Sequence, residues 1–176
     1  MAIVSQSELI LQRREWKRNG KSVVCAAGAF DLLHPGHIRL LEQSRGLGDI
    51  LVVALQSDAS VRASGLPEPN RGEAREAAAA RRAVARPVTP AAERAEILAA
   101  LAAVDYVVEF DEPTPRELFA RLAPEIVVKG GEAGSQESAF RDDEAVTAAG
   151  AQVVQLPLEP GHSTSLLITR ITQLHA

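Results

Sequence analysis

The sequence predicts an α/β fold: a Rossmann-like, open parallel sheet of about five strands with helices on both faces. Five short apolar runs, rich in Val, alternate with segments of helical spacing. The runs are almost continuously apolar, which is typical of strands covered on both faces. Because a helix that joins two strands makes a right-handed crossover, this alternation favours a parallel sheet. The 176 residues suit one domain, residues 1–176, and with 46% hydrophobic but only 3% aromatic residues its core is aliphatic.

The opening helix is predicted over residues 8–18, where Leu9, Ile10 and Trp16 share one side and Asn19-Gly20 is a common helix stop. The strands that follow are predicted at 22–27, 50–55, 106–110, 125–129 and 151–156. Between and after them, helical patterns predict helices at 37–46, 91–103, 115–122, 142–149 and 164–174. In such folds ligands bind beyond the carboxyl ends of the strands, so the residues after each strand are the first candidates for a site.

Residues 63–86 interrupt the alternation and are predicted to be an insertion. A turn region with Pro and Gly leads into an Ala- and Arg-rich stretch, and residues 71–86 hold five Arg and two Glu without a strong apolar stripe. We favour an exposed insertion with helix-forming alanines, because charge runs are usually solvated. The alternative is a lid that brings guanidinium groups to phosphates.

Composition excludes several classes of function. A net charge of −4 gives no support to a role on nucleic acid or at a membrane surface. No apolar run approaches the roughly 20 residues that cross a bilayer, and the charged N-terminal stretch lacks the apolar region of a secretion signal. The single Cys25 cannot form an internal disulfide and is expected to pack within a strand. We therefore expect a cytoplasmic protein.

The stretch FDLLHPGH, residues 30–37, follows the first predicted strand and carries the strongest functional signal. Gly36 near a helix start lets the backbone approach a ligand, and the free N–H groups of a helix start favour anions. His34 and His37 would donate hydrogen bonds to phosphate oxygens and stabilise the charge that builds on them. The alternative is that one histidine caps the helix and the other packs, but the place after the first strand favours phosphate binding.

Other chemical groups follow later strands, and each has a structural alternative. Asp58 follows the second strand, where a turn-forming role is the alternative to binding sugar hydroxyls or a metal-bound water. Arg94 lies early in a helix, within reach of a triphosphate or simply at the surface. Lys129 and Gly130 end the fourth strand, as phosphate ligands or as a plain turn. Residues 163–165, Ser-Thr-Ser, open the last helix, where Ser and Thr are also good N-caps.

The stretch GAFDLLHPGHIRLLEQSRGLGDILVVAL resembles the nucleotidyltransferase superfamily, whose signature is H-x-G-H. Class I aminoacyl-tRNA synthetases share that signature, but this chain is too short and has no K-M-S-K-S-like loop. The chain is most similar to the adenylyltransferase domain of ADP-heptose synthases, which carries strings similar to GKSVV, RPVTPAAERAEILAALAAVDYVV, VKGG and LPLEPGHSTS in this order. The likeness runs from about residue 8 to 173, apart from the insertion at 63–86.

This resemblance implies transfer of the adenylyl group of ATP to a sugar phosphate, D-glycero-β-D-manno-heptose 1-phosphate, with release of pyrophosphate, as in ADP-heptose and lipopolysaccharide biosynthesis. It implies in-line attack without a covalent intermediate, and Mg²⁺ held by phosphates and waters rather than by protein ligands. The implied partners are small molecules, and a homodimer is left open. The implied catalytic residues are His34, His37 and Lys129; the acceptor-binding residues Asp31 and Asp58; and the nucleotide-binding residues Gly28, Ala29, Phe30, Gly36, Arg94, Gly130, Ser163, Thr164 and Ser165.

The nucleotide, the acceptor and catalysis itself have alternatives. Glycerol-3-phosphate cytidylyltransferases, which use CTP, share the GxFDLLHxGH wording but carry an arginine where this chain has Leu158, which favours adenylyl transfer. The lysine of an R-L-K-G string is absent near residues 62–65, and the aromatic of V-K-G-G-D-Y is replaced at Ala133. We hypothesise that an arginine of 71–86 replaces the lysine, with Arg81 and Arg82 to be tested first. A nucleotide-binding module without catalysis is the third alternative.

Overall fold

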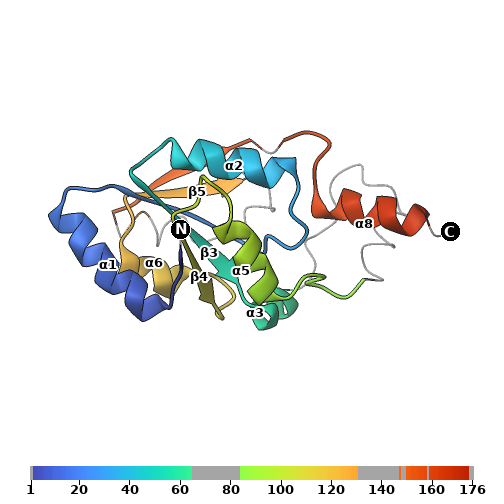
Figure 1. The fold of residues 1–176 in the computed structure, drawn as a ribbon, viewed down its shortest axis with the longest axis horizontal. Coiled ribbons are helices and arrows are strands. Elements are labelled where there is room, and N and C mark those ends of the chain that lie inside the picture. The colour runs from blue at the N-terminus through green and yellow to red at the C-terminus, as the bar shows by residue number, and fades with distance from the viewer. Residues whose placement is uncertain (1, 65–83, 131–146, 148–149, 158, 175–176) are drawn as a thin grey trace.

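The computed structural model describes residues 2–64, 84–130, 147, 150–157 and 159–174. Within these ranges the strands form one sheet in the order β1-β4-β3-β2-β5-β6, and every neighbouring pair is parallel (Figure 1). The strands are β1 (Ala2–Ile3), β2 (Val23–Gly28), β3 (Ile50–Gln56), β4 (Tyr106–Phe110), β5 (Ile126–Gly130) and β6 (Gln152–Leu156). The helices are α1 (Gln6–Arg18), α2 (Pro35–Arg45), α3 (Asp58–Ser64), α5 (Ala91–Ala99), α6 (Arg116–Leu122) and α8 (Thr164–Gln173).

The predicted α/β fold with a parallel sheet is confirmed, with differences of detail. The sheet has six strands in the described residues instead of about five, because the two-residue β1 adds to the β4 edge. The sequence analysis also missed the short helix α3, which begins right after β3. The helix predicted at 91–103 ends earlier, at Ala99. The helix predicted at 142–149 and most of the insertion at 63–86, including Arg81 and Arg82, lie outside the described residues.

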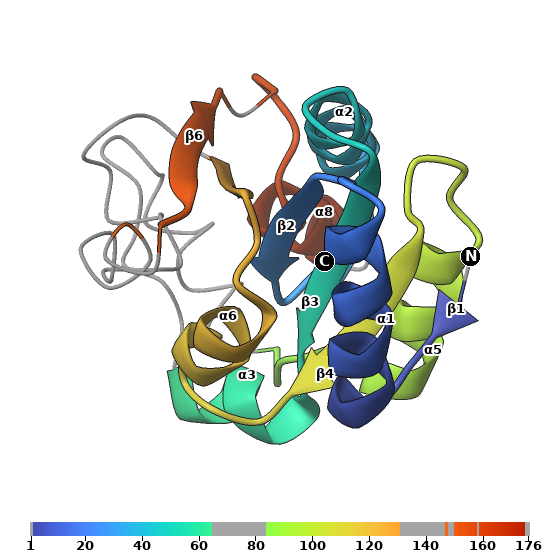
Figure 2. The same ribbon diagram turned by 90° about the vertical axis from the view of Figure 1, so that its left-hand side faces the viewer.

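Helices cover both faces of the sheet because alternate strand residues point to opposite sides. On one face, α1 and α6 contribute Leu9 and Phe119 to a buried cluster with strand residues such as Val52. On the other face, α2 and α5 contribute Leu41 and Leu98 to a second cluster. Figure 2 shows the sheet between these helices, from β6 on the left to β1 on the right. The near-continuous apolar character of the strands follows from this double coverage.

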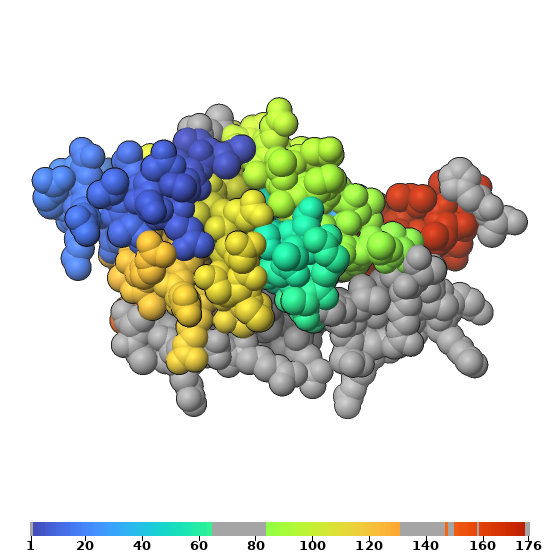
Figure 3. All heavy atoms as spheres, turned by 90° about the horizontal axis from the view of Figure 1, so that it is seen from below, coloured from blue at the N-terminus to red at the C-terminus, as the bar shows by residue number. Residues whose placement is uncertain are grey.

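The strand order places a switch point at the centre of the sheet. From β2 the chain crosses through α2 to β3 on one side, whereas β5 pairs with β2 on the other side. The carboxyl ends of β2 and β5 therefore lie side by side where the strand order reverses. In α/β sheets of this kind ligands bind beyond the carboxyl ends of the strands at such a switch point. Helix α8 lies at the end of the molecule opposite α1 (Figures 1 and 3).

A buried arginine fastens the amino edge of the sheet. Arg13 of α1 is only 6% exposed. It donates hydrogen bonds to the carbonyls of Leu122 and Ala123, at 3.0 and 2.9 Å, and to the Glu125 carboxylate at 2.6 Å. The other oxygen of Glu125 accepts from the backbone N–H of Val23, the first residue of β2. The end of α6 and the starts of β2 and β5 are thus tied to α1.

The centre of the sheet is fully buried and contains the chain's single cysteine. Cys25, on β2, has no exposed surface, and burial raises the pKa of its thiol. This confirms the expected packing of Cys25 within a strand. None of the helices in the described ranges is long and apolar enough to cross a membrane.

Candidate active site

The loop from β2 to α2 turns sharply at Phe30. Phe30 has a left-handed backbone, with φ of 44°, and its side chain is buried. The Phe30 ring folds back over Gly28, where a Cβ would lie 3.4 Å from it, in ordinary van der Waals contact. The chain then reaches His34, the N-cap of α2, and Pro35 occupies the first turn of the helix as is common. The predicted phosphate-binding loop is therefore a strand-to-helix turn at the carboxyl edge of the sheet.

His34 and His37 form a stacked pair of imidazoles. Their ring centroids are 3.8 Å apart with an interplanar angle of 20°, and the Phe30 ring lies 5.3 Å from that of His37. His34 makes no side-chain capping bond to α2, so the alternative of a capping histidine is not what the structure shows. The Nδ1 atoms of both rings are buried and have no hydrogen-bond partner among the described residues. Both imidazoles are thus held for some purpose other than helix capping.

The surroundings keep both imidazoles neutral. Burial, the neighbouring His34 and the Arg86 guanidinium lower the pKa of His37 to about 3, partly opposed by Asp31. Burial and the nearby His162 also lower the pKa of His34. Near neutral pH each ring therefore carries one N–H and one lone pair. Neutral imidazoles of this kind donate hydrogen bonds to phosphate oxygens without first releasing a proton.

Gly36 lies in close contact with the His34 ring. A Cβ at Gly36 would lie 3.0 Å from Nδ1 and 3.1 Å from Cε1 of His34, and 3.4 Å from Cβ of His162. Contacts of 3.0–3.1 Å would push the His34 ring away from the helix. The glycine in H-x-G-H thus makes room for the first histidine, as well as allowing close approach of a ligand.

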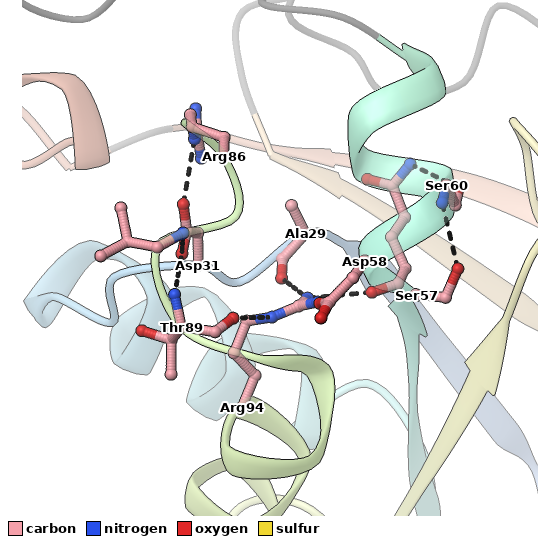
Figure 4. Close-up of polar contacts among 10 residues, drawn as sticks. Ala29, Asp31, Ser57, Asp58, Ser60, Arg86, Thr89 and Arg94 are labelled. Carbon is pink, nitrogen blue, oxygen red and sulfur yellow. Dashed lines mark hydrogen bonds and ion pairs between the residues drawn. The ribbon is translucent and has the colours of Figure 1, made fainter. Parts of the chain in front are cut away.

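Asp31 fastens the segment that precedes α5. Its buried carboxylate accepts hydrogen bonds from the backbone N–H groups of Val88 and Thr89, at 2.8 and 3.0 Å, and from Nε of Arg86 at 3.0 Å (Figure 4). Asp31 was predicted to bind the acceptor. The structure occupies both of its oxygens with protein donors, and this places the partly buried Arg86 beside the histidine pair.

Arg94 and Asp58, predicted separately as ligand-binding residues, are bonded to each other. Arg94 rises from α5 between the loops after β2 and β3 and is fully buried (Figure 4). It donates to the Asp58 carboxylate at 2.6 Å and to the carbonyls of Thr89 and Gln56 at 2.8 and 2.9 Å. It also donates to the carbonyl of Ala29. Arg94 thereby links three segments of the carboxyl edge: the loop after β2, the end of β3 with the start of α3, and the segment before α5.

The start of α8 brings the Ser-Thr-Ser residues to the same place. Ser163 is the N-cap, and its side chain accepts from the Leu166 N–H at 3.1 Å. The Thr164 hydroxyl lies 3.5 Å from the carbonyl of Leu32, in the histidine loop. The start of α8, with Ser165 in its first turn, therefore lies next to the loop that carries His34.

Lys129 and Gly130 are the last residues of β5, which pairs with β2. Lys129 is only 3% exposed, and Gly130 pairs with Leu156 of β6. Because side chains alternate along a strand, Lys129 shares its face with Val127, which belongs to the cluster under α1 and α6. Leu158, Glu132 and Ala133, which distinguish this chain from related families in sequence, lie outside the described residues.

Two residues of this cluster were not among the predicted site residues. Arg86 lies at the end of the predicted insertion, within the stretch 71–86 from which an arginine was hypothesised to replace a lysine, but it was not singled out, and its pairing with Asp31 shows its place. His162 directly precedes the Ser-Thr-Ser residues, and its ring lies 6.4 Å from that of His34. Its position before a helix that starts at the carboxyl edge is the signal that sequence reasoning could have used.

Together these groups suit an anionic ligand. Neutral imidazoles, a guanidinium and the N-termini of α2 and α8 are all donors of hydrogen bonds. The described residues contain no group of three or more His, Cys, Asp or Glu side chains placed to hold a metal ion. Asp31 and Asp58 are both bonded to arginines.

Comparison with known proteins identifies the family of this chain. Residues 25–170 match the family model described as cytidylyltransferase-like. The chain is 43% identical over 168 residues to the bifunctional protein HldE of Koribacter versatilis, covering 96% of this chain and 31% of that protein. It is 45% identical over 158 residues to bifunctional protein HldE of Citrifermentans bemidjiense, covering 90% of this chain and 28% of that protein. The chain thus spans about a third or less of the length of these curated relatives.

The fold is also similar to that of solved structures. A lipopolysaccharide core biosynthesis protein from Thermoplasma volcanium superposes with a TM-score of 0.58, at 24% identity, over 80% of this chain and 98% of that protein. At this level of identity the likeness concerns the fold alone. The arrangement of strands and helices in this chain is thus similar to that of a solved structure.

Proposed function

Because the chain belongs to the cytidylyltransferase-like family, we propose that it is a nucleotidyltransferase that transfers the adenylyl group of ATP to a sugar phosphate, with D-glycero-β-D-manno-heptose 1-phosphate as the acceptor. The observation that carries the proposal is the stacked pair of imidazoles, His34 and His37, which lies at the start of α2 and close to the start of α8. Two such groups beside two helix starts fit a chain of phosphates. The relatives named HldE, and the shared sequence strings, support the adenylyl branch.

In the proposed reaction an oxygen of the acceptor phosphate attacks the α-phosphorus of ATP in line. The new P–O bond forms as the bond from the α-phosphorus to the bridging oxygen breaks, and pyrophosphate leaves with that electron pair. The residues act by alignment and by stabilising charge, so no protein nucleophile is needed. Mg²⁺, bound with the triphosphate, would neutralise part of the charge on the leaving group.

Each residue takes a role from its position. His34 and His37 donate to the α-phosphoryl oxygens, and the start of α8 at residues 163–165 receives the leaving phosphates. Lys129 and Gly130 lie beside the nucleotide at the end of β5. Arg94 and Asp58 hold the loops after β2 and β3 in register. Asp31, predicted to bind the acceptor, would act through the segment 86–89 that it fastens.

The nucleotide and the acceptor are tested together. Pyrophosphate release is measured with ATP or CTP, each with heptose 1-phosphate or glycerol 3-phosphate, on the wild type and on His37→Ala. We expect turnover with ATP and heptose 1-phosphate that His37→Ala abolishes. Turnover with CTP alone would instead favour the glycerol-3-phosphate cytidylyltransferase branch. Binding of ATP without turnover in any mixture would favour a nucleotide-binding module.

We further propose that the protein acts in the cytoplasm on small molecules and forms a homodimer. The proposal of a dimer is drawn from the resemblance to small family members, which commonly pair. Sedimentation equilibrium at micromolar concentration gives the test. A mass of one chain throughout the concentration range would refute the dimer.

A further inference from the structure

We infer that His162 is a third phosphate-binding imidazole of this site, which contacts the triphosphate alongside His34 and His37. The inference rests on the proposed function for the identity of the ligand. It concerns a residue outside the H-x-G-H motif and outside the Ser-Thr-Ser residues at the start of α8.

The three imidazoles form one column of rings. The His162 ring lies 6.4 Å from that of His34 and is inclined to it by only 21°. His34 in turn stacks on His37 at 3.8 Å, and Phe30 closes the column below His37. His162 is therefore at the outer end of the column. His162 is partly exposed, and its imidazole adds a donor next to the two that the motif supplies.

The backbone holds His162 in this position from two sides. Gly161 has φ of 77°, a left-handed conformation that turns the chain into α8. The N–H of His162 donates to the carbonyl of Glu159 at 3.3 Å, and the Glu159 carboxylate is paired with Arg39 of α2. The turn before α8 is thus attached to the helix that carries His37. Such bracing is expected for a ligand-binding ring and is more than an exposed loop histidine needs.

Space and charge both show that His162 and His34 are close. Cβ of His162 lies 3.4 Å from where a Cβ on Gly36 would be, on the same side as the His34 ring. His162 also lowers the pKa of His34. The charged groups around the column are Arg86 and Asp31, beside His37. No hydrogen bond joins the His162 imidazole to another described residue, so its ring nitrogens are available to a ligand.

The test compares His162→Phe with His162→Gln. Phe keeps an aromatic ring at the end of the column but removes the ring N–H, whereas Gln restores a donor. We expect His162→Phe to raise the KM for ATP about tenfold with a smaller change in kcat, and His162→Gln to recover most of that loss. His175→Phe, which removes the remaining histidine of the sequence, serves as the matched control. An ATP KM in His162→Phe equal to that of the wild type overturns the inference.

A second measurement separates this inference from the proposed function. NMR titration of the imidazoles follows binding of inorganic tripolyphosphate without any transfer reaction. We expect His162→Phe to weaken this binding by a factor similar to the change in KM, and to raise the pKa of His34 in the free protein because a neighbouring imidazole is lost. If no acceptor supports turnover but tripolyphosphate binding depends on His162, the inference holds and the proposed transfer fails. If tripolyphosphate binds equally to wild type and His162→Phe, the inference fails whatever the enzyme assay shows.

Discussion

Replacing Arg94 with Met tests whether the carboxyl edge is held together by one guanidinium. The group is fully buried and donates to three backbone carbonyls and to Asp58. Met fills a similar volume but leaves the carbonyls of Ala29, Gln56 and Thr89 without this donor. The side chain of Asp58 is 32% exposed and keeps access to water when Arg94 is replaced. Breaking this ion pair therefore lowers the free energy of unfolding less than it would for a buried carboxylate.

The expected cost follows from these contacts. Removing one partner of a buried ion pair costs about 3–5 kcal/mol, and the stranded carbonyls contribute within that range. That is a large share of the roughly 5–15 kcal/mol by which a domain is stable. Since about 1 kcal/mol corresponds to roughly 2–4 °C in a chain of this size, the Tm of Arg94→Met should fall by about 6–20 °C. Urea unfolding gives the free energy directly.

Arg13→Met provides the matched control at the opposite edge of the sheet. Arg13 is also buried and bonded to two carbonyls and a carboxylate, so this variant should lose stability on a comparable scale. Assayed at a temperature where both variants are folded, Arg94→Met should lose at least tenfold in kcat/KM and Arg13→Met should lose little. A stability loss below about 1 kcal/mol in Arg94→Met, or equal activity losses in the two variants, would refute the reasoning.

Three other changes probe the histidine loop. Gly36→Ala should lower kcat roughly 10- to 100-fold, because the added Cβ displaces the His34 ring. The Tm should stay nearly unchanged, since Ala favours the helix by about 0.5–1 kcal/mol. An unchanged kcat would contradict the displacement of the ring. Burial lowers the pKa of His37 to about 3 in the folded protein, below its value in the unfolded chain. The contribution of His37 to stability is therefore complete above about pH 6.5 and is lost toward pH 3, by up to about 1.4 kcal/mol per pH unit. His37→Phe should flatten this pH dependence of the unfolding free energy in urea titrations, and an unchanged slope would argue against the burial of the neutral imidazole. Asp31→Asn should cost about 1–3 kcal/mol in urea unfolding, because residues 86–89 lose a charged acceptor, and an unaltered midpoint would contradict that role.

The sequence carried enough information for the sheet and the histidine loop. The apolar runs are long and uniform, since both faces of the sheet are covered, so β2 to β6 were found within a residue or two. By contrast, β1 has two residues and α3 seven, too few for a period to show. The histidine loop was found because its chemistry lies within eight consecutive residues.

Pairing between distant residues could not be predicted in the same way. Arg94 and Asp58 are separated by 36 positions, and each was judged alone, as a donor and an acceptor for ligands. Only the fold shows that the two satisfy each other. His162 was missed for a similar reason, because its neighbour in the ring column, His34, lies in the loop after β2 at the far end of the sequence.

The buried position of Cys25 has a practical consequence for following this protein in solution. The chain has one thiol, and it is enclosed at the centre of the sheet with its thiolate disfavoured. Maleimide reagents should leave the folded protein unmodified and react once it unfolds, so thiol reactivity reports global opening without any mutation. For the same reason, a cysteine introduced at an exposed position such as Leu174 can be labelled with a fluorophore in the native state while Cys25 stays in place. The same chain can then report unfolding through its native thiol and ligand binding through the added one.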